Sequence, residues 1–567
     1  MNLGTKKNTQ TQQKLIKAIV ILISLIAFKW DGIGQEIRVH VIINDSLENE
    51  QQSIQQKFNT QSQAKDFFSN QLNQFLKQGY LNTWIDSTIN QPTHSKHYLS
   101  LNKKIDSINI KIPKQYQEYL KTNNNETLIA FEKWGEFQNI FLQQLSEEGY
   151  NFSKITYAPL SVNENILNAE LQLEINKQRK INDLVIRGYE EFPEGFRRHF
   201  LNIKRGELYT ERKLRRKTKA LQNIDFVNEI KNPEVQFTKD SVNLFLYLEK
   251  NKINSFDGFI GFGNSEEGSG LNLNGYLDVL LKNNLNYGET LIIRYKNDGQ
   301  EQQIFKSRIS IPFIFNSRFS PEAGIELFRQ DSTFSRNKQE IRLGYHINHQ
   351  WETFADLELV SSSNLSSDDA NTTNQPITDF NARFYGITTR FNNRKRNIGE
   401  IINRDYAELR LLRGNRSTSA ASQAQTKIEF YGETLQKLVS KTYAHLASTI
   451  HVLQSGNYVD NELERLGGLR SIRGFDENSL IASSFYSLQT EIRYFLSPDL
   501  YANTVLDYGY YENKLINFDE NLFSFGFGIG LNTKGGLLRL IFANGRSSQQ
   551  EFNFQNTQVH LSLNTFF

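Results

Sequence analysis

The sequence contains no cysteine. This absence excludes disulfide bonds, thiolate metal sites, cysteine nucleophiles and a lipid-modified N-terminal cysteine. An excess of one charge is missing too, because 65 Lys and Arg residues are balanced by 62 Asp and Glu residues, and the balance gives no reason to expect a nucleic-acid partner. No GxSxG, HExxH or paired Ser/His motif stands out. We therefore expect no enzyme, with no catalytic residues, no metal ion and no cofactor.

Long apolar runs are scarce, and the mean hydropathy is −0.54. The one clear run, Ala18 to Phe28, follows several lysines and is shorter than the ~20 residues that a spanning helix needs. Small residues follow it at Gly32 and Gly34, so it predicts a signal peptide over residues 1–34, with an uncleaved anchor helix as the alternative. A chain this polar can still occupy a membrane as a β-barrel, because only alternate residues of its strands face lipid.

A small α+β unit recurs between residues 35 and 251, and we divide it into residues 35–108, 109–179 and 180–251. Each copy combines an amphipathic helical stripe with alternating strands. The stripes are Phe68, Leu72, Phe75 and Leu76 in the first copy, Trp134, Phe137, Phe141 and Leu145 in the second, and Leu214 and Leu221 after a Thr210 N-cap in the third. The strands predicted to close the copies are Ile108 to Ile112, Ala169 to Ile175 and Ser241 to Lys250. Modules in series without a catalytic loop between them suggest docking surfaces.

The third copy carries "RGYEEFP" and then "RGELYT", Arg205 to Thr210. With the order strand–helix–helix–strand–strand, these segments resemble the POTRA domain of outer-membrane assembly proteins; the first two copies are assigned by period and pattern. The resemblance implies that the modules bind client chains partly by offering a sheet edge. The alternative is that neighbours cover the edges and the modules are only spacers. The basic run from Arg197 to Lys219 is interpreted as a solvated helix face, with contact to acidic lipid headgroups as the alternative.

From residue 252 to residue 567 the pattern changes to strands alone, in which apolar and polar residues alternate. Every second residue is apolar in segments such as Ile341 to Ile347 and Phe523 to Leu531. A soluble β-sandwich also alternates, but its dry core would not tolerate the charges on the polar face here. These charges include Arg294, Lys306, Arg308, Asp356 and Glu358. We therefore predict an all-β transmembrane barrel of antiparallel strands over residues 252–567.

The segment "LGGLRSIRGFDENSL", Leu466 to Leu480, interrupts this pattern with three glycines and two arginines. Its centre, Ser471 to Phe475, resembles the [V/I]-R-G-[F/Y] signature of the BamA/TamA-type outer-membrane assembly family, which joins POTRA domains to a β-barrel. The segments "LQTEIRYF" and "VLDYGYYEN" that follow, and the terminal "QVHLSLNTFF", resemble the family's last strands. The similarity spans the mature chain and is clearest over residues 460–567.

The resemblance implies a barrel of 16 strands, where counting alternating segments gives about 14 to 16. It also implies a loop that folds back into the barrel, in which Arg473 reaches Asp507 and lies near Glu491. The residues expected to hold the loop, which we name the loop lock, are Arg473, Gly474, Phe475, Asp507 and Glu491. Glycines permit the close backbone approach that such a loop needs. The alternative is an ordinary surface loop whose arginines face water.

The first barrel strand carries Gly258, Gly261 and Gly263, and glycine weakens strand pairing. The seam between this strand and the last strand, which ends at Phe567, is therefore predicted to be the weakest in the barrel and suited to lateral opening. A bend near the POTRA junction is the alternative. The last strand lacks the glycine that often permits a kink in this family, which counts against opening on that side.

Together these features predict an outer-membrane protein assembly or insertion factor, with the layout of TamA-type members. Client strands would bind at POTRA edges and at the lateral seam. The expected location is the outer membrane of a Gram-negative bacterium, with the POTRA domains in the periplasm. The expected partners are unfolded outer-membrane proteins, outer-membrane lipid and a periplasm-spanning protein. The main alternative is a two-partner-secretion-type pore that exports a passenger; a barrel enzyme and an adhesin or receptor are further alternatives.

Overall fold

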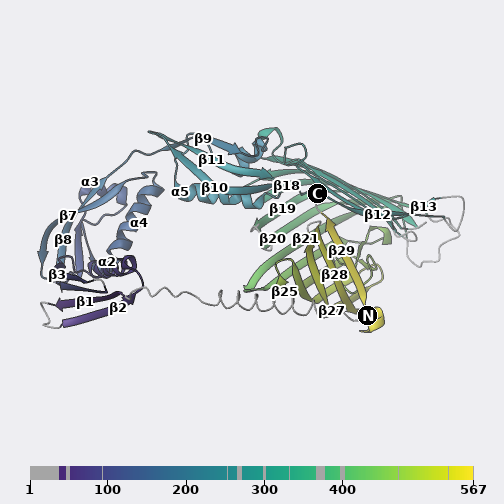
Figure 1. Ribbon diagram of the computed structural model, residues 1–567. Helices are drawn as coiled ribbons and strands as arrows, with labels where there is room; N and C mark the ends of the chain where they lie inside the picture. Colours follow the sequence, from purple (N-terminus) through teal and green to yellow (C-terminus); the bar gives the residue numbers. More distant parts are fainter. Residues whose placement is uncertain are drawn as a thin grey trace, which may run out of the picture. The chain divides into compact units, whose positions relative to one another are not determined.

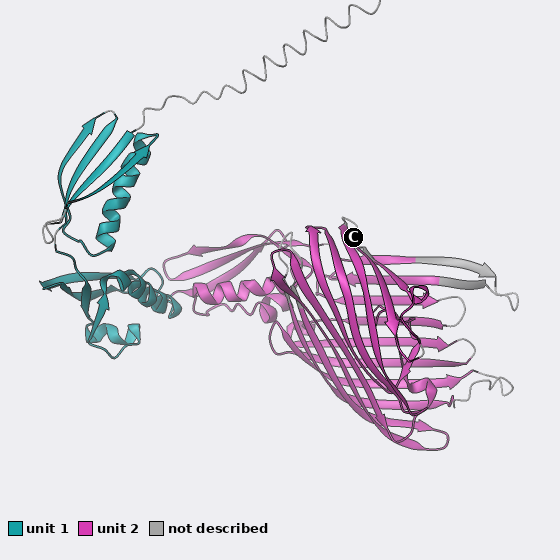
Figure 2. Cartoon of the chain, turned by 90° about the horizontal axis from the view of Figure 1, so that it is seen from below, with its two compact units in different colours: residues 1–178 teal, residues 179–567 magenta. Residues whose placement is uncertain are grey.

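The computed structural model forms two compact units, residues 1–178 and residues 179–567 (Figure 2). The structure describes residues 37–45, 51–91, 93–101, 103–251, 253–264, 271–297, 302–330, 333–365, 377–395, 403–469, 471–533, 536–548 and 550–565. The predicted signal peptide, residues 1–34, and Phe567 lie outside these ranges. None of the helices within them is long and apolar enough to cross a membrane.

The first sheet of unit 1 has the strand order β2-β1-β4-β3. Its elements are β1 (Ile37–Asp45), β2 (Gln51–Phe58), α2 (Gln61–Lys77), β3 (Trp84–Gln91) and β4 (His94–Leu101). The side-chain oxygen of Thr60 caps α2, whose Phe68 and Phe75 pack against the buried Val41 and Leu99. The POTRA order has two helices after its first strand. In this copy the first of them is replaced by β2, which pairs with β1 in an antiparallel ladder, so the order is strand–strand–helix–strand–strand.

The second sheet of unit 1 has the order β6-β5-β8-β7. Its elements are β5 (Ser107–Lys111), α3 (Lys114–Leu120), β6 (Glu126–Ala130), η1 (Phe131–Lys133), α4 (Trp134–Glu147), β7 (Lys154–Asn163) and β8 (Ile166–Glu174). The expected boundary after residue 108 falls inside β5, so the division between the two sheets lies earlier, between Leu101 and Ser107. The strand around Ile108 opens the second sheet instead of closing the first, because β5 pairs with β6 and β8.

Unit 2 begins with a third α+β sheet of order β10-β11-β9. Its elements are β9 (Lys180–Arg187), the π-helical turn η2 (Phe196–Phe200), α5 (Glu211–Lys219), η3 (Ala220–Asn223), β10 (Val227–Phe237) and β11 (Ser241–Lys250). The Thr210 N-cap is confirmed, since its hydroxyl oxygen accepts a hydrogen bond from the amide N–H of Lys213 at 3.3 Å. Leu214 and Leu221 are buried in the core of this sheet, as the helical stripe predicted.

The rest of unit 2 is one antiparallel sheet of sixteen strands, joined in chain order and curled into a barrel (Figures 1 and 2). The strands are β12 (Ser255–Asn264), β13 (Leu271–Lys282), β14 (Thr290–Asn297), β15 (Gln302–Ser310), β16 (Phe319–Gln330), β17 (Phe334–His346), β18 (Trp351–Asn364), β19 (Phe380–Lys395), β20 (Asn403–Thr418), β21 (Ser422–Val439), β22 (Thr442–Ser455), β25 (Ser484–Ser497), β26 (Leu500–Asn513), β27 (Phe518–Thr533), β28 (Gly536–Arg546) and β29 (Gln558–Thr565). Sixteen is the strand number that the resemblance implied.

The alternation predicted for these strands is seen in their burial. In β17, Ile341 is 59% exposed on the outer surface, whereas its neighbour Arg342 is 4% exposed on the inner one. Phe525, Phe527 and Ile529 of β27 are likewise exposed on the outer surface. A wall that is apolar outside and charged inside is the pattern expected of a barrel in lipid.

The third sheet is joined to the barrel by packing as well as by the chain. Phe313, in the turn after β15, is buried in the core of the third sheet, where its ring lies 4.9 Å from that of Phe196. The hydroxyl of Tyr189 donates a hydrogen bond to Asn286 at 2.8 Å and accepts one from Asn283 at 2.7 Å. The third sheet and the barrel wall therefore form one body at this contact.

Candidate functional site: the loop inside the barrel and the surfaces around it

The loop between β22 and β25 contains a small hairpin of β23 (Glu464–Leu466) and β24 (Leu480–Ala482). Gly474 lies in the connection between these two strands with a φ of +80°, and a Cβ atom there would sit 2.5 Å from the backbone nitrogen of Gly545 in β28. A side chain is therefore excluded by backbone conformation and by space at once. The glycine of the "RGF" sequence lets the loop lie directly against the backbone of the barrel wall.

Arg473 lies on the inner wall and is only 2% exposed. Its Nε donates to Asp507 Oδ2 at 2.8 Å, its Nη2 donates to Asp507 Oδ1, and its backbone N–H donates to Asp507 Oδ2 at 3.2 Å. Its Nη1 donates to Glu491. The structure thus brings together the arginine and the two carboxylates that the sequence singled out. The fork of the guanidinium matches Asp507 bidentately, a strong form of charge-assisted hydrogen bond.

Two further arginines pair with Glu491. Arg493 Nε donates to Glu491 Oε2 at 2.7 Å, and Arg539 Nη2 donates to Glu491 Oε1 at 2.8 Å. Arg539 belongs to β28 and was not anticipated, because its carboxylate partner lies 48 positions earlier in the sequence. The loop arginine therefore enters a small network that already links two wall strands.

Phe475 anchors the loop by apolar packing. It is buried with Ile472 of the loop and with Phe485, Tyr511 and Leu522 of the wall. A Cβ atom at Gly545 would lie 2.7 Å from its ring, so the missing side chain at that position makes room for it. All five residues of the loop lock lie in this region of the barrel, on or against β25, β26 and β28.

The first half of the loop is fixed to a different part of the wall, which the sequence did not indicate. Asn461 is fully buried, and its Nδ2 donates to Ser362 Oγ at 2.9 Å and to the carbonyl of Thr378 at 3.0 Å. Glu462 pairs with Arg416 and accepts a hydrogen bond from Gln425 at 2.7 Å. These partners lie on or next to β18 to β21. No local motif marks Asn461, because its partners are 99 and 83 positions away.

The loop also touches the wall near the start of the barrel. Lys296 of β14 pairs with Glu477, and Asn478 Nδ2 donates to Gln302 Oε1 of β15 at 2.9 Å. The loop therefore contacts β14 and β15, the β18 to β21 region, and β25 to β28. A segment held in this way crosses the interior and braces the wall from within.

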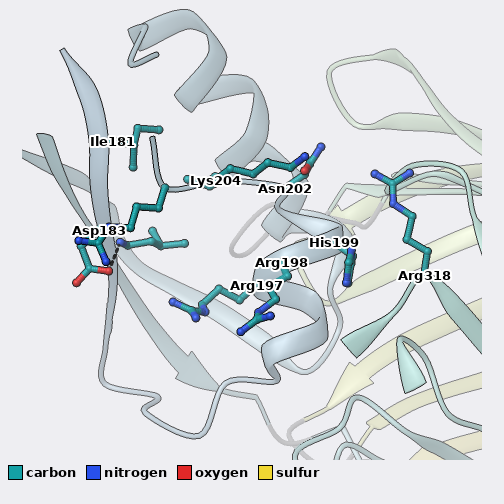
Figure 3. Close-up of a pocket in the computed structure, with 11 residues that line it drawn as sticks. Ile181, Asp183, Arg197, Arg198, His199, Asn202, Lys204 and Arg318 are labelled. Carbon is teal, nitrogen blue, oxygen red and sulfur yellow. Dashed lines mark hydrogen bonds between the residues drawn. The ribbon is translucent and has the colours of Figure 1, made fainter. Parts of the chain in front are cut away.

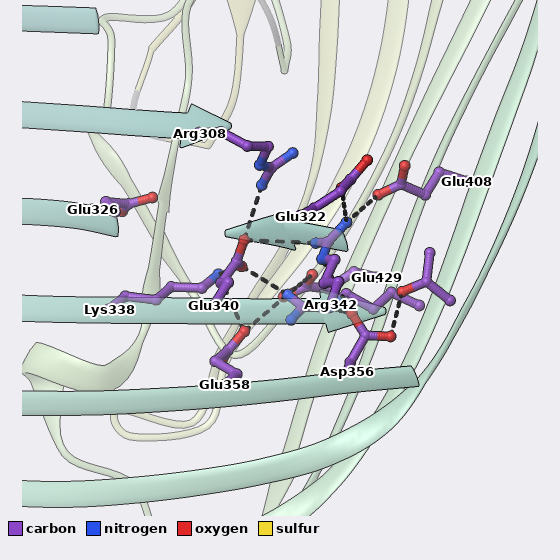
Figure 4. A network of polar contacts seen from close by, with 12 residues as sticks. Arg308, Glu322, Glu326, Lys338, Glu340, Arg342, Asp356, Glu358, Glu408 and Glu429 are labelled. Carbon is purple, nitrogen blue, oxygen red and sulfur yellow. Dashed lines mark hydrogen bonds and ion pairs between the residues drawn. The ribbon is translucent and has the colours of Figure 1, made fainter. Parts of the chain in front are cut away.

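The inner wall of β15 to β21 carries a dense network of ion pairs (Figure 4). Arg410 of β20 is 2% exposed, and its Nη1 lies 2.9 Å from Glu340 and 2.8 Å from Glu358. Further pairs within the network join Arg308 to Glu340, Arg342 to Asp356 and Glu408, Arg390 to Glu322 and Glu408, and Lys427 to Glu358. The long side chains reach over intervening strands, so the network ties together strands that are not neighbours.

The charges that the sequence assigned to the polar face lie within this lining or near it. Arg308, Asp356 and Glu358 belong to the network, whereas Lys306 pairs with Glu326 at 2.9 Å and Arg294 pairs with Asp278 at 3.2 Å. The cations and carboxylates are interleaved, so the wall presents no field of one sign. Across the described ranges, no cluster of three or more His, Asp or Glu side chains is placed to hold a metal ion.

The two ends of the sheet, β12 and β29, approach each other. In the described part of the chain, the strand order places them at opposite ends and no ladder joins them. Gly258, Gly261 and Gly263 face Leu277, Asn274 and Asn272 of β13 in register. A Cβ atom at Gly258 would lie 2.6 Å from the carbonyl oxygen of Tyr276, so this glycine is packed closely against β13.

The outer strands of the first two α+β sheets expose apolar side chains. β3 is an edge strand, and its Trp84 is 64% exposed with Ile85 and Ile89 also exposed. In the second sheet, the edge strand β7 exposes Leu160 and Val162, and the edge strand β6 exposes Leu128. Within unit 1, these strands combine an unpaired backbone edge with an apolar surface.

No family model matches the sequence, and no curated protein matches it. Among solved structures, CdiB from Acinetobacter baumannii aligns with a TM-score of 0.51 at 15% identity over 89% of this chain and 98% of that chain. CdiB from Escherichia coli aligns with a TM-score of 0.51 at 11% identity over the same shares of both chains, 89% and 98%. BamA from Haemophilus ducreyi lacking POTRA domains 1–3 aligns with a lower TM-score of 0.46, at 14% identity over 81% of this chain and 98% of that chain. The chain shares the fold of the two CdiB structures, which is the fold expected from its motifs: POTRA-like α+β units followed by a sixteen-stranded antiparallel β-barrel.

Proposed function

We propose that this protein is a non-enzymatic assembly factor that inserts β-barrel proteins into the outer membrane of a Gram-negative bacterium. Residues 252–567 span that membrane, and the POTRA-like units lie in the periplasm. The apolar outer face of the barrel and its charged interior support the membrane location. The expected partners are unfolded outer-membrane proteins, membrane lipid and a periplasm-spanning protein.

The observation that carries the proposal is the apolar edge of the first two sheets. An edge strand offers free N–H and C=O groups that pair with an extended segment of any sequence, and soluble proteins usually protect such edges with charge. β3 instead exposes Trp84, Ile85 and Ile89 beside its free edge. A nascent membrane strand, which is extended and apolar on one face, is suited to this surface.

Depletion of the protein tests this role. We expect several β-barrel proteins to disappear together from the outer membrane, and full-length protein to restore them. Ile85→Lys with Ile89→Lys should restore them poorly, because two charges on an exposed edge disfavour strand addition without touching the core. The matched control is Ser69→Lys with Asn73→Lys, on the exposed surface of α2, which should restore them fully. Equal rescue by both double variants would contradict client binding at β3.

The second candidate is a pore that exports one passenger, as in two-partner secretion. The likeness to the two CdiB structures favours it, since both share the fold over 89% of this chain. Under this alternative, depletion would remove one secreted protein and leave the outer-membrane proteins unchanged. The family resemblance associates such pores with two POTRA domains and an N-terminal plug helix, whereas three α+β copies and no plug helix are predicted from this sequence.

We further propose that the seam between β12 and β29 opens for client strands. The chain has no cysteine of its own, so a cysteine in β12 and another in β29 would form the only disulfide. Oxidation should abolish insertion activity, and reduction should restore it. A control disulfide between Val279→Cys and Ile293→Cys joins β13 to β14, which are already paired, and should have no effect. Full activity of the oxidised seam variant would refute the gate.

The loop lock is proposed to keep the barrel braced while the seam opens. Arg473 and Phe475 attach the loop to the wall at β25 to β28, and Asn461 attaches it at β18. A wall supported from inside at several points can release one edge without collapsing. The contacts support this proposed role, which does not depend on the identity of the client.

A further inference from the structure

A cavity of about 560 Å³ lies where the third α+β sheet meets the barrel. Its walls are strongly basic, and Figure 3 shows Arg318 at the barrel side facing the segment that carries His199 and Asn202. The basic side chains are Arg197, Arg198, His199, Lys204, Arg205 and Arg318, against one acidic residue, Asp183. A concave surface with this excess of cations attracts anions.

Some of these cations are neutralised within the protein and others are not. Arg197 donates to Glu194 through Nε at 2.6 Å and Nη2 at 2.7 Å, and Arg198 pairs with the same carboxylate. The hydrogen bond from Arg197 lowers the pKa of Glu194, which favours the charged carboxylate, and the two arginines share its single negative charge. Three remaining cations, Lys204, Arg205 and Arg318, form no ion pair with any described carboxylate.

The partners that two of these cations do have are neutral. Arg205 Nη2 donates to the side-chain oxygen of Asn182 at 3.3 Å, and Arg318 Nη1 donates to the carbonyl of Ile347 at 3.3 Å. Neutral acceptors orient a guanidinium but leave its charge uncompensated. The remaining N–H groups can therefore bind an anion in the cavity.

The cavity borders the apolar outer face of the barrel. Arg318 lies in the turn between Phe315, which is 93% exposed, and Phe319, whose ring lies 5.5 Å from that of Tyr345. Trp351, at the start of β18, is also exposed on this end of the wall. Exposed aromatic side chains at the end of membrane strands mark the level of the lipid headgroups.

We propose that this cavity binds the phosphate headgroup of an anionic phospholipid. Lys204, Arg205 and Arg318 contact the phosphate, and the acyl chains lie along Phe319 and Tyr345 on the outer wall. Free phosphate would use the cations but would gain nothing from the aromatic surface beside them. The inference rests on the membrane location proposed above and not on client assembly.

Lipid binding to the purified full-length protein in detergent tests the proposal. Titration with dioctanoyl phosphatidylglycerol should show binding about 10-fold tighter than titration with dioctanoyl phosphatidylcholine, and added salt should reduce this preference. A triple variant with Lys204→Gln, Arg205→Gln and Arg318→Gln should lose the preference for phosphatidylglycerol over phosphatidylcholine. The control is a second triple variant with Lys213→Gln, Lys219→Gln and Lys239→Gln. It also loses three positive charges, from exposed positions outside the cavity, and should keep the preference for phosphatidylglycerol.

Three results would overturn the assignment. The cavity variant could keep the preference for phosphatidylglycerol. Sodium phosphate could displace the lipid at equal concentration, which would identify a site for free phosphate. An octaglutamate peptide could displace it equally well, which would identify a site for acidic protein segments. No client protein takes part in this binding measurement. A protein that does not assemble β-barrels could therefore still prefer phosphatidylglycerol, so the lipid site and the assembly function are tested independently.

Discussion

Arg473→Ala should destabilise the barrel by about 3–5 kcal/mol, because it leaves the buried carboxylate of Asp507 without its guanidinium partner. Asp507 and Glu491 are 4% and 2% exposed, so water cannot replace the lost guanidinium. Glu491 keeps Arg493 and Arg539, and Asp507 therefore carries most of the penalty. The loop should also detach locally from β26, since only the backbone N–H of residue 473 would still reach Asp507.

The measurement is the denaturant midpoint of the purified barrel in detergent, together with the heat needed to change its mobility on a gel. Arg294→Ala is the matched control, because Arg294 pairs with Asp278 on the same wall but both side chains are well exposed, at 42% and 37%. Exposed pairs contribute about 0–1 kcal/mol. Limited proteolysis of the α+β units should be unchanged in both variants. An Arg473→Ala barrel as stable as the control would contradict the proposed lock.

Arg410→Met should cause a loss of similar size, about 3–5 kcal/mol, at a site far from the loop lock in sequence. Methionine keeps most of the side-chain volume, so the change removes charge with little effect on packing. Arg410 contacts Glu340, Glu358 and Glu429 from three other strands, and Glu358 has no exposed surface. These carboxylates would repel one another once the shared cation is gone.

Adding Glu358→Gln to Arg410→Met removes one of the stranded charges. The double variant should be more stable than the sum of the single changes predicts, with a coupling energy of about 1–3 kcal/mol. Lys306→Met is the control, since Lys306 is 47% exposed and pairs with Glu326 near the open part of the lining. Denaturant unfolding of the unmodified protein, the two single variants, the double variant and the control gives the comparison. Additive effects would show that Arg410 and Glu358 do not act as a pair.

The local parts of this structure could be predicted because their causes are local. Alternation from Ile341 to Ile347 predicts a strand with one apolar and one polar face, and β17 has its apolar face on the outside of the barrel. Thr210 precedes an amphipathic stripe and caps α5 as expected. The contact between Arg473 and Asp507 could be predicted only through a motif, because the sequence "SIRGF" and the two strands after it resemble a known arrangement.

The elements that escaped prediction depend on distant partners. β2 contains only two apolar residues, Ile54 and Phe58, and becomes a strand because β1 offers it a ladder. The strand at Ile108 was assigned to the wrong sheet, since strand pattern does not reveal which neighbour it joins. Arg410 is an ordinary inward-facing residue of a barrel strand until the curvature of the wall brings Glu340, 70 positions away, to 2.9 Å.

By itself the sequence determined that residues 252–567 form alternating strands, which face of each strand is apolar, and which loop carries an arginine between glycines. These features follow from backbone geometry and from the spacing of apolar residues. Only the tertiary structure decided that the loop is anchored on opposite parts of the wall, that the lining charges form one neutralised network, and that unpaired cations gather beside exposed aromatic residues. These features arise from closing the sheet into a barrel, which brings together side chains that no local pattern relates.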